Sequence, residues 1–159
     1  MRQVADISKQ GGVMVLEALI ALLIFTMGIL AVIGMQARSI AQTMEAHYRV
    51  DAAFLGNQIL SLIWADRLNV TGYACSPCTT STTNTTVQAW VTQIQSTNSQ
   101  SAYLPGVTDK VNQPTIVVGN VTDPQGVLTG HTVTVTLSWK SPQSGATHSY
   151  TTMAQINLY

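Results

Sequence analysis

A single carboxylate interrupts the most apolar part of the sequence. Glu17 is the one ionisable residue between Val13 and Met35, in a stretch that reads VMVLEALIALLIFTMGILAVIGM. An ionised carboxylate is costly to place in hydrocarbon and usually has a partner there. Glu17 therefore indicates an ion-pairing site in apolar surroundings. The alternative is that Glu17, about one turn from the end of the stretch, snorkels to the membrane interface.

Two closely spaced cysteines form a second candidate site, Cys75-Ser76-Pro77-Cys78. In a reducing cytosol such a pair suggests metal or redox chemistry, and outside the cytoplasm it suggests a small disulfide. Redox CxxC motifs lie where a strand enters a helix, and the helix N-terminus lowers the pKa of a thiol. Here the pair follows a predicted helix and precedes the Thr-rich segment 79–86, which favours a structural disulfide. Free thiols and a redox pair remain alternatives.

The histidines form no third site. His47, His131 and His148 lack paired metal-ligand spacing, so we expect polar surface or interface histidines and no metal. No G-x-S-x-G, P-loop or dinucleotide motif appears, and the region after the apolar stretch has no obvious acid/base cluster. The sequence therefore predicts a protein that is not an enzyme and needs no cofactor.

Composition limits the partners. Charged residues make up 9% of the 159 residues, against roughly 25% in soluble domains. Seven basic and seven acidic side chains cancel, so nothing suggests nucleic-acid binding through phosphate neutralisation. The low charge comes from the apolar stretch and from a Ser/Thr/Asn/Gln-rich remainder, a composition common in exported bacterial proteins.

The apolar stretch, residues 13–35, has the length of a membrane span. At about 1.5 Å per residue it forms roughly 34 Å of helix, enough for a hydrocarbon core of about 30 Å. Cleaved secretory signals have apolar stretches of roughly 7–15 residues that end at a small-residue site, and this stretch is longer and lacks such a site. Arg2 and Lys9 outnumber Asp6 before it, which favours a cytoplasmic N-terminal flank and export of the rest.

The residues GG-VMVLEALIALLIF resemble the class III signal sequence of type IV prepilins. That signal is a short basic leader ending in Gly, followed by an apolar helix with Glu at its fifth position. The resemblance implies a leader over residues 1–12, cleavage after Gly12 by a membrane prepilin peptidase, and methylation of the new amine on Val13. Glu17 would then pair with the amine of a neighbouring subunit and set the register of assembly. The chain departs from the pattern at Val13, where Phe or Met is more usual.

The string MGILAVIGMQ resembles minor pilins of the PilV type. Many major pilins carry a Pro near the position of Gly34, which favours a minor role. The resemblance implies a subunit that helps initiate or cap a type IV pilus, and so supports adhesion and twitching motility. Its implied partners are other major and minor pilins, the prepilin peptidase, the inner membrane and the pilus assembly platform.

The implied location is the bacterial inner membrane, crossed once with a periplasmic head, and the pilus or cell surface after assembly. The I-type minor pseudopilin of type II secretion has a very similar anchor and is an alternative. An alternative from another class is a membrane-anchored periplasmic thiol-redox enzyme that uses Cys75 and Cys78.

Beyond the span, the sequence predicts one continuous helix of about fifty residues. Residues 36–66 form its amphipathic half, with Glu45 and Arg49 at the favourable i,i+4 spacing. Apolar residues recur every three or four positions and predict a buried face: Ile40, Met44, Tyr48, Ala52, Leu55, Ile59 and Leu62.

The remainder predicts a connecting region, residues 67–114, and a sheet, residues 115–159. The connecting region contains a short helix around Val87, Trp90, Val91 and Ile94, with Thr85 or Thr86 as its N-cap. Strands are expected over residues 115–121, over residues 132–139 and, after a turn at 141–145, over residues 150–159. Trp90 and Trp139 are expected in the core. The prediction is an α+β, pilin-like fold, in which a long N-terminal helix packs on a C-terminal antiparallel sheet.

Overall fold

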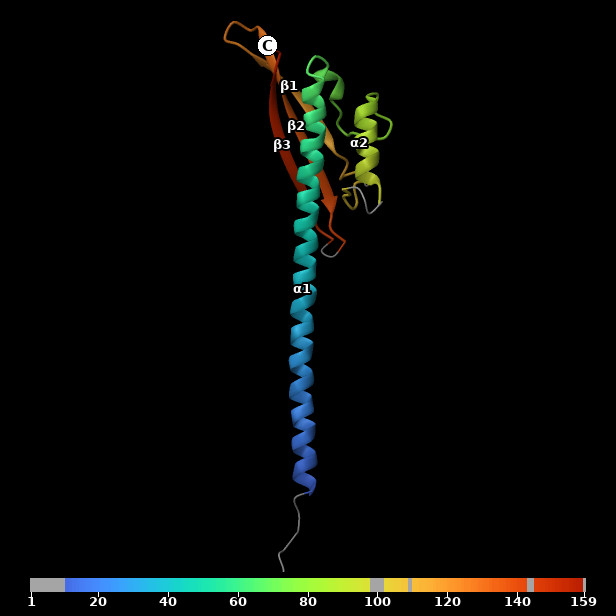
Figure 1. Ribbon diagram of the computed structural model, residues 1–159, viewed down its shortest axis with the longest axis vertical. Helices are drawn as coiled ribbons and strands as arrows, with labels where there is room; N and C mark the ends of the chain where they lie inside the picture. Colours follow the sequence, from blue (N-terminus) through green and yellow to red (C-terminus); the bar gives the residue numbers. More distant parts are fainter. Residues whose placement is uncertain (1–10, 98–101, 109, 143–144, 159) are drawn as a thin grey trace, which may run out of the picture. The chain divides into compact units, whose positions relative to one another are not determined.

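The structure is a computed structural model that describes residues 11–97, 102–108, 110–142 and 145–158. It confirms the predicted α+β fold, in which a long N-terminal helix packs on a three-stranded antiparallel sheet (Figure 1). Its elements are α1 (Gly11–Ala65), the 3₁₀ helix η1 (Val70–Tyr73), α2 (Thr85–Gln95), β1 (Thr115–Thr122), β2 (Leu128–Lys140) and β3 (Thr147–Asn157).

Helix α1 is continuous over 55 residues, as predicted. No proline interrupts it, so no backbone hydrogen bond of the helix is lost to a missing N–H. The chain divides into two compact units along this helix, the first ending at Gln42 and the second, the head, beginning at Thr43. Residues 1–10 of the predicted leader lie outside the described residues.

The C-terminal part of α1 buries the predicted face only in part. Tyr48, Ala52, Leu55 and Ile59 are buried as expected. Ile40 and Leu62 were wrongly placed on this face, since they are 64% and 39% exposed. Ile63 is buried in place of Leu62 because it lies one four-residue step beyond Ile59, which keeps it on the stripe that meets the core.

The sheet has the order β1-β2-β3, with both neighbouring pairs antiparallel. Strand β2 alternates as predicted, and its residues Val133, Val135, Leu137 and Trp139 are buried. Strand β3 begins earlier than the predicted residue 150, because the Ser141 N–H donates to the Ala146 carbonyl at 3.1 Å and closes a shorter turn. Tyr159, at the end of the predicted strand, lies outside the described residues.

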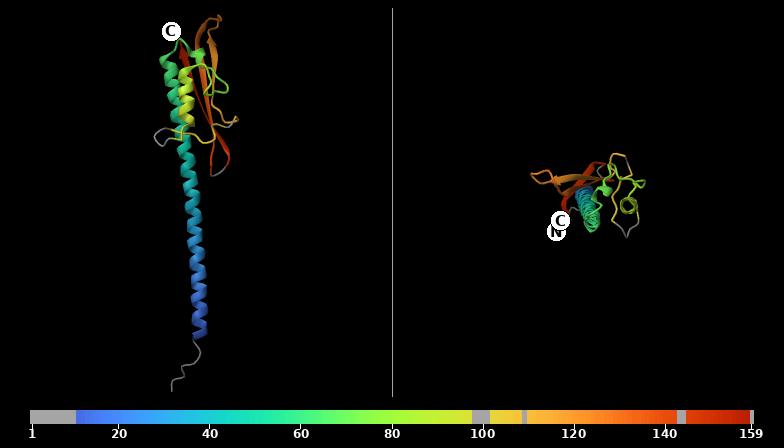
Figure 2. Two further views of the ribbon diagram at one scale, coloured as in Figure 1. Left: turned by 90° about the vertical axis from the view of Figure 1, so that its right-hand side faces the viewer. Right: turned by 90° about the horizontal axis from the view of Figure 1, so that it is seen from above.

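Gly56 is a point of close approach between α1 and the sheet. A Cβ atom at this position would lie 3.1 Å from Thr152 Cγ2 and 3.4 Å from Tyr150 Cε1. The missing side chain therefore lets the helix backbone come close to β3. Figure 2 shows the head from two further sides, with α2 beside α1.

Helix α2 begins at a different cap from the one predicted. Asn84, and not Thr85 or Thr86, is its N-cap: the Asn84 Oδ1 accepts from the Thr86 N–H at 3.0 Å and the Val87 N–H at 3.2 Å. Asn caps helices better than Thr, and the Asn84 side chain also donates to the Gly72 carbonyl. Trp90 is buried as predicted, and its Nε1 donates to the Leu55 carbonyl at 3.0 Å, which attaches α2 to α1.

The cap assignment can be tested with a matched pair of variants. Asn84→Ala removes both capping bonds and should lower the free energy of unfolding by about 0.5–2 kcal/mol. Thr85→Ala alters an exposed side chain in the first turn and should change it by less than about 0.5 kcal/mol. Thermal or denaturant unfolding of the full chain measures both changes. Equal losses in the two variants would contradict Asn84 as the cap.

Candidate functional site

The first unit of the chain exposes an apolar helix surface. The described residues contain one helix that is long and apolar enough to cross a membrane, and its most apolar window has a mean hydropathy of 2.7 and no buried residue. Val13, Phe25 and Met35 are 68%, 65% and 73% exposed. Such a surface is unfavourable in water over this length, whereas hydrocarbon or other apolar helices would solvate it. This agrees with the predicted span over residues 13–35, by length and composition.

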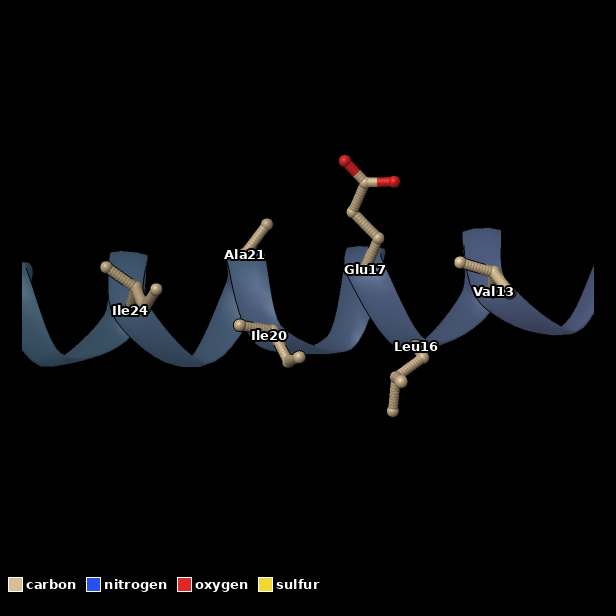
Figure 3. A pocket seen from close by; sticks show the side chains of 6 residues that line it. All are labelled: Val13, Leu16, Glu17, Ile20, Ala21 and Ile24. Carbon is tan, nitrogen blue, oxygen red and sulfur yellow. The ribbon is translucent and has the colours of Figure 1, made fainter.

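Glu17 lies on this surface, one turn after Val13. Figure 3 shows the Glu17 carboxylate pointing away from the helix on the same side as Ala21, while Leu16 and Ile20 point to the other side. These residues, with Val13 and Ile24, line a shallow apolar groove along the helix. Within the part of the chain that the structure describes, no cation forms an ion pair with Glu17.

The predicted cleavage position lies at the start of α1. The helix begins at Gly11, so the bond between Gly12 and Val13 falls in the first turn. The first four N–H groups of a helix have no partner in that helix, and glycine is the least favourable helix former after proline. A helix end that starts with two glycines opens at low cost, and Val13 and Glu17 occupy successive turns beyond Gly12.

Cys75 and Cys78 form a disulfide, as predicted from their position after a helix and before the Thr-rich segment. Cys75 exchanges two backbone hydrogen bonds with Ile116 on β1, at 3.0 and 2.8 Å, and the Cys78 N–H donates to the Pro114 carbonyl at 2.8 Å. Cys78 is fully buried. The disulfide closes a loop that holds the segment after η1 against the start of β1.

Tyr73 supports the same loop from η1. Its hydroxyl donates to the Asp66 carboxylate at 3.1 Å, just beyond the end of α1. Burial, followed by the bond to Asp66, raises the pKa of Tyr73 above its ordinary value. The CxxC segment thus follows a helix and a 3₁₀ turn and ends against a strand, which is not the strand-to-helix setting of a redox CxxC.

The three histidines have different surroundings. His47 is mostly exposed and its Nδ1 lies 3.0 Å from the Asp51 carboxylate. His131 is buried, so the expectation of a surface or interface position is wrong for this residue. It falls on β2 opposite Ile156, in the row that faces the core. The described ranges contain no group of three or more His, Cys, Asp or Glu residues that could hold a metal ion.

A polar contact between α1 and β3 was not anticipated. His148 Nδ1 lies 3.1 Å from Glu45 Oε1, and the predicted Glu45–Arg49 pair is present at 3.7 Å. The His148 ring stacks on Trp139, with ring centroids 5.8 Å apart. Helical spacing could reveal the Glu45–Arg49 pair, but no local signal connects Glu45 with a strand residue so distant in the sequence.

Comparison of the chain with family models, with curated proteins and with solved structures finds no match.

The disulfide can be tested by reduction. The entropy of closing so short a loop corresponds to about 2 kcal/mol, so reduction should lower the free energy of unfolding of the full chain by about that amount. A variant with both Cys75→Ala and Cys78→Ala should be insensitive to the reductant. A native chain whose stability and mass do not change on reduction would contradict the disulfide.

Proposed function

We propose that this chain is a minor pilin, a structural subunit that enters a type IV pilus through α1 and helps to initiate or cap its assembly. Glu17 is the observation that carries the proposal. It is a lone carboxylate on an exposed apolar helix surface, at the fifth position after Gly12. A plain membrane anchor gives no reason for a carboxylate there.

The proposed chemistry is the formation of one ion pair between subunits. Cleavage after Gly12 by the prepilin peptidase frees a positively charged amine on Val13, which the same enzyme methylates. That amine and the Glu17 carboxylate are each costly to hold in hydrocarbon. If Glu17 of one subunit contacts the amine of its neighbour, both costs fall together. Because hydrophobic burial drives helix association only weakly in lipid, such a pair would dominate the choice of register.

The location and partners follow from this mechanism. Before assembly the chain would cross the bacterial inner membrane once, with the head in the periplasm. Residues 1–12 would carry the weakly basic flank that stays in the cytoplasm. The assembly platform would then bring it together with major and minor pilins, and the assembled subunit would lie in the pilus at the cell surface, where it supports adhesion and twitching motility. An exported head also fits the disulfide, since disulfides persist outside the reducing cytosol.

The same anchor suits an I-type minor pseudopilin of type II secretion. The residues that carry the proposal, Gly12, Val13 and Glu17, are common to both kinds of filament. The helix without proline at Gly34 favours a minor subunit in either. A redox enzyme is the less favoured alternative, because burial of Cys78 restricts attack on its sulfur and the segment lacks the helix N-terminus that activates redox thiols.

The role of Glu17 can be tested with variants of similar shape. Glu17→Gln and Glu17→Leu should insert into the membrane normally, because both remove a charge from the span. They should fail to enter filaments, because the Val13 amine of the neighbour is then left without a counter-ion. Leu16→Ala, on the other side of the helix, serves as the control. The amounts of chain in the membrane and in sheared filaments are the measurements, and either Glu17 variant assembling at the native level would refute the proposal.

The processing step has its own readout. The intact mass of the chain from the cell should correspond to an N-terminus at methylated Val13. An uncleaved chain beginning at Met1 would count against both the pilin and the pseudopilin hypothesis and favour a plain anchor. Deletion of the gene then separates pilus from pseudopilus: loss of pili with secretion intact is expected for the minor pilin, and the converse for the pseudopilin.

A further inference from the structure

The outer edge of β3 has unpaired backbone groups. The Ser141 N–H donates to the Ala146 carbonyl and the Leu158 N–H donates to the Thr129 carbonyl, which establishes that even-numbered residues of β3 direct their backbone groups toward β2. The odd-numbered residues therefore direct their N–H and C=O groups away from the sheet. Among the described residues, no backbone group pairs with this edge. Its members are Thr147, Ser149, Thr151, Met153, Gln155 and Asn157.

This edge also lacks the features that usually prevent strand pairing. Natural edges are protected by charged side chains, prolines, bulges or a covering segment. Strand β3 contains no Lys, Arg, Asp, Glu, Pro or Gly, and its register with β2 has no shift over its whole length. An eleven-residue regular edge of this kind is a template for a further strand.

Among the described residues, the opposite edge, on β1, has a backbone partner at its start. Cys75 pairs with Ile116 through the two hydrogen bonds described above, so the backbone groups of Ile116 point outward. Because direction alternates along a strand, those of Val118 and Asn120 point outward as well. Residues 117–121 of β1 lie beyond the Cys75 contact and contain no charged residue, and the regular edge ends there because the register with β2 shifts between Val121 and Thr122.

The directions of the two edges determine how copies of the chain can meet. Both β1 and β3 are antiparallel to β2, so they run in the same direction. Strand β3 also runs in the direction of the head segment of α1, since His148 is near Glu45 and Thr152 is near Gly56 (Figure 1). Copies that lie side by side with these α1 segments pointing the same way therefore bring β3 of one copy to β1 of the next, in parallel.

We propose that the outer edge of β3 is an interface between copies of this chain in one membrane, where it pairs in parallel with residues 117–121 of β1 in a second copy. Donors and acceptors on the two edges complement one another, and neither edge presents a charge that would repel its partner. The contact is heterologous, so it extends into a row of subunits and does not close as a dimer. It needs only a common membrane and goes beyond the proposed pilin function.

The interface is expected to be weak between free chains. A strand pair is far smaller than the roughly 1,200–2,000 Å² that stable protein interfaces bury. Confinement of two copies to one membrane raises their effective concentration, which allows a small contact of this kind to form.

A photoreactive amino acid at the exposed position Met153 tests the proposal in the full chain in its native membrane. Mixing isotope-labelled and unlabelled chains identifies crosslinks between copies by mass spectrometry. We expect crosslinks from position 153 to the β1 edge of the second copy. Thr151→Pro, which removes an outward N–H and no bond to β2, should reduce their yield several-fold. Thr151→Val keeps the N–H and should preserve it.

Both Thr151 variants lose the same side-chain contact with Thr136, so they differ chiefly in the backbone donor. If the proline variant unfolds at a lower temperature than the valine variant, Thr151→Lys replaces it as the blocking change. Crosslinks only between β3 strands, crosslinks only to another protein, or none from a folded chain would overturn the proposal. So would a full crosslink yield in a folded blocking variant. None of these outcomes alters the test of Glu17, so the two proposals fail separately.

Discussion

The close approach of α1 to the sheet at Gly56 determines how the head is built. A Cβ atom at this position would lie 3.1 Å from Thr152 and 3.4 Å from Tyr150, so glycine allows this close approach of the helix backbone to β3 without displacing the Thr152 side chain. Leu55 and Ile59, on either side of Gly56, are then fully buried, and Leu137 on β2 completes the contact. At the start of the head segment, Glu45 lies beside His148, so that the helix and the strand are held at two points.

The connecting region depends on this packing as well. Helix α2 is attached to α1 by the bond from Trp90 to the Leu55 carbonyl, and Gln58 donates to Gln93 at 3.1 Å. The disulfide and the Cys75–Ile116 pairing hold the other end of the region against β1. A long segment with little regular structure is thus restrained at both ends by elements that are already fixed, which lowers the entropic cost of ordering it.

The two parts of α1 differ in how their apolar residues are covered. Its head segment has the sheet to cover its apolar stripe, whereas the large apolar residues described in the segment before Thr43 are exposed. Glu17 is the one ionisable residue between Val13 and Met35. Under the proposed function, the charge that disfavours Glu17 in lipid is the property that makes its pairing with a neighbouring subunit selective.

What could be derived from the sequence is the part governed by periodicity and local chemistry. The apolar run, the helical stripe and the alternation in β2 each repeat with a period that specifies helix or strand, and the Glu45–Arg49 pair follows from one helical turn. Glu17 was identifiable as the one carboxylate in the apolar stretch, and Cys75 and Cys78 as a closely spaced pair, whereas Val13 was named only through the resemblance to the prepilin signal.

The tertiary structure decided what depends on residues distant in the chain. The contact of Glu45 with His148 follows from where β3 meets α1, which no local pattern encodes. Asn84 is the N-cap of α2, and its side chain also donates to the distant Gly72 carbonyl. The disulfide lies against the sheet because Cys75 pairs with Ile116 on β1. For Glu17 the tertiary structure adds its exposure on the apolar helix surface, because no cation of the described chain pairs with it, and under the proposed function its partner belongs to a neighbouring subunit.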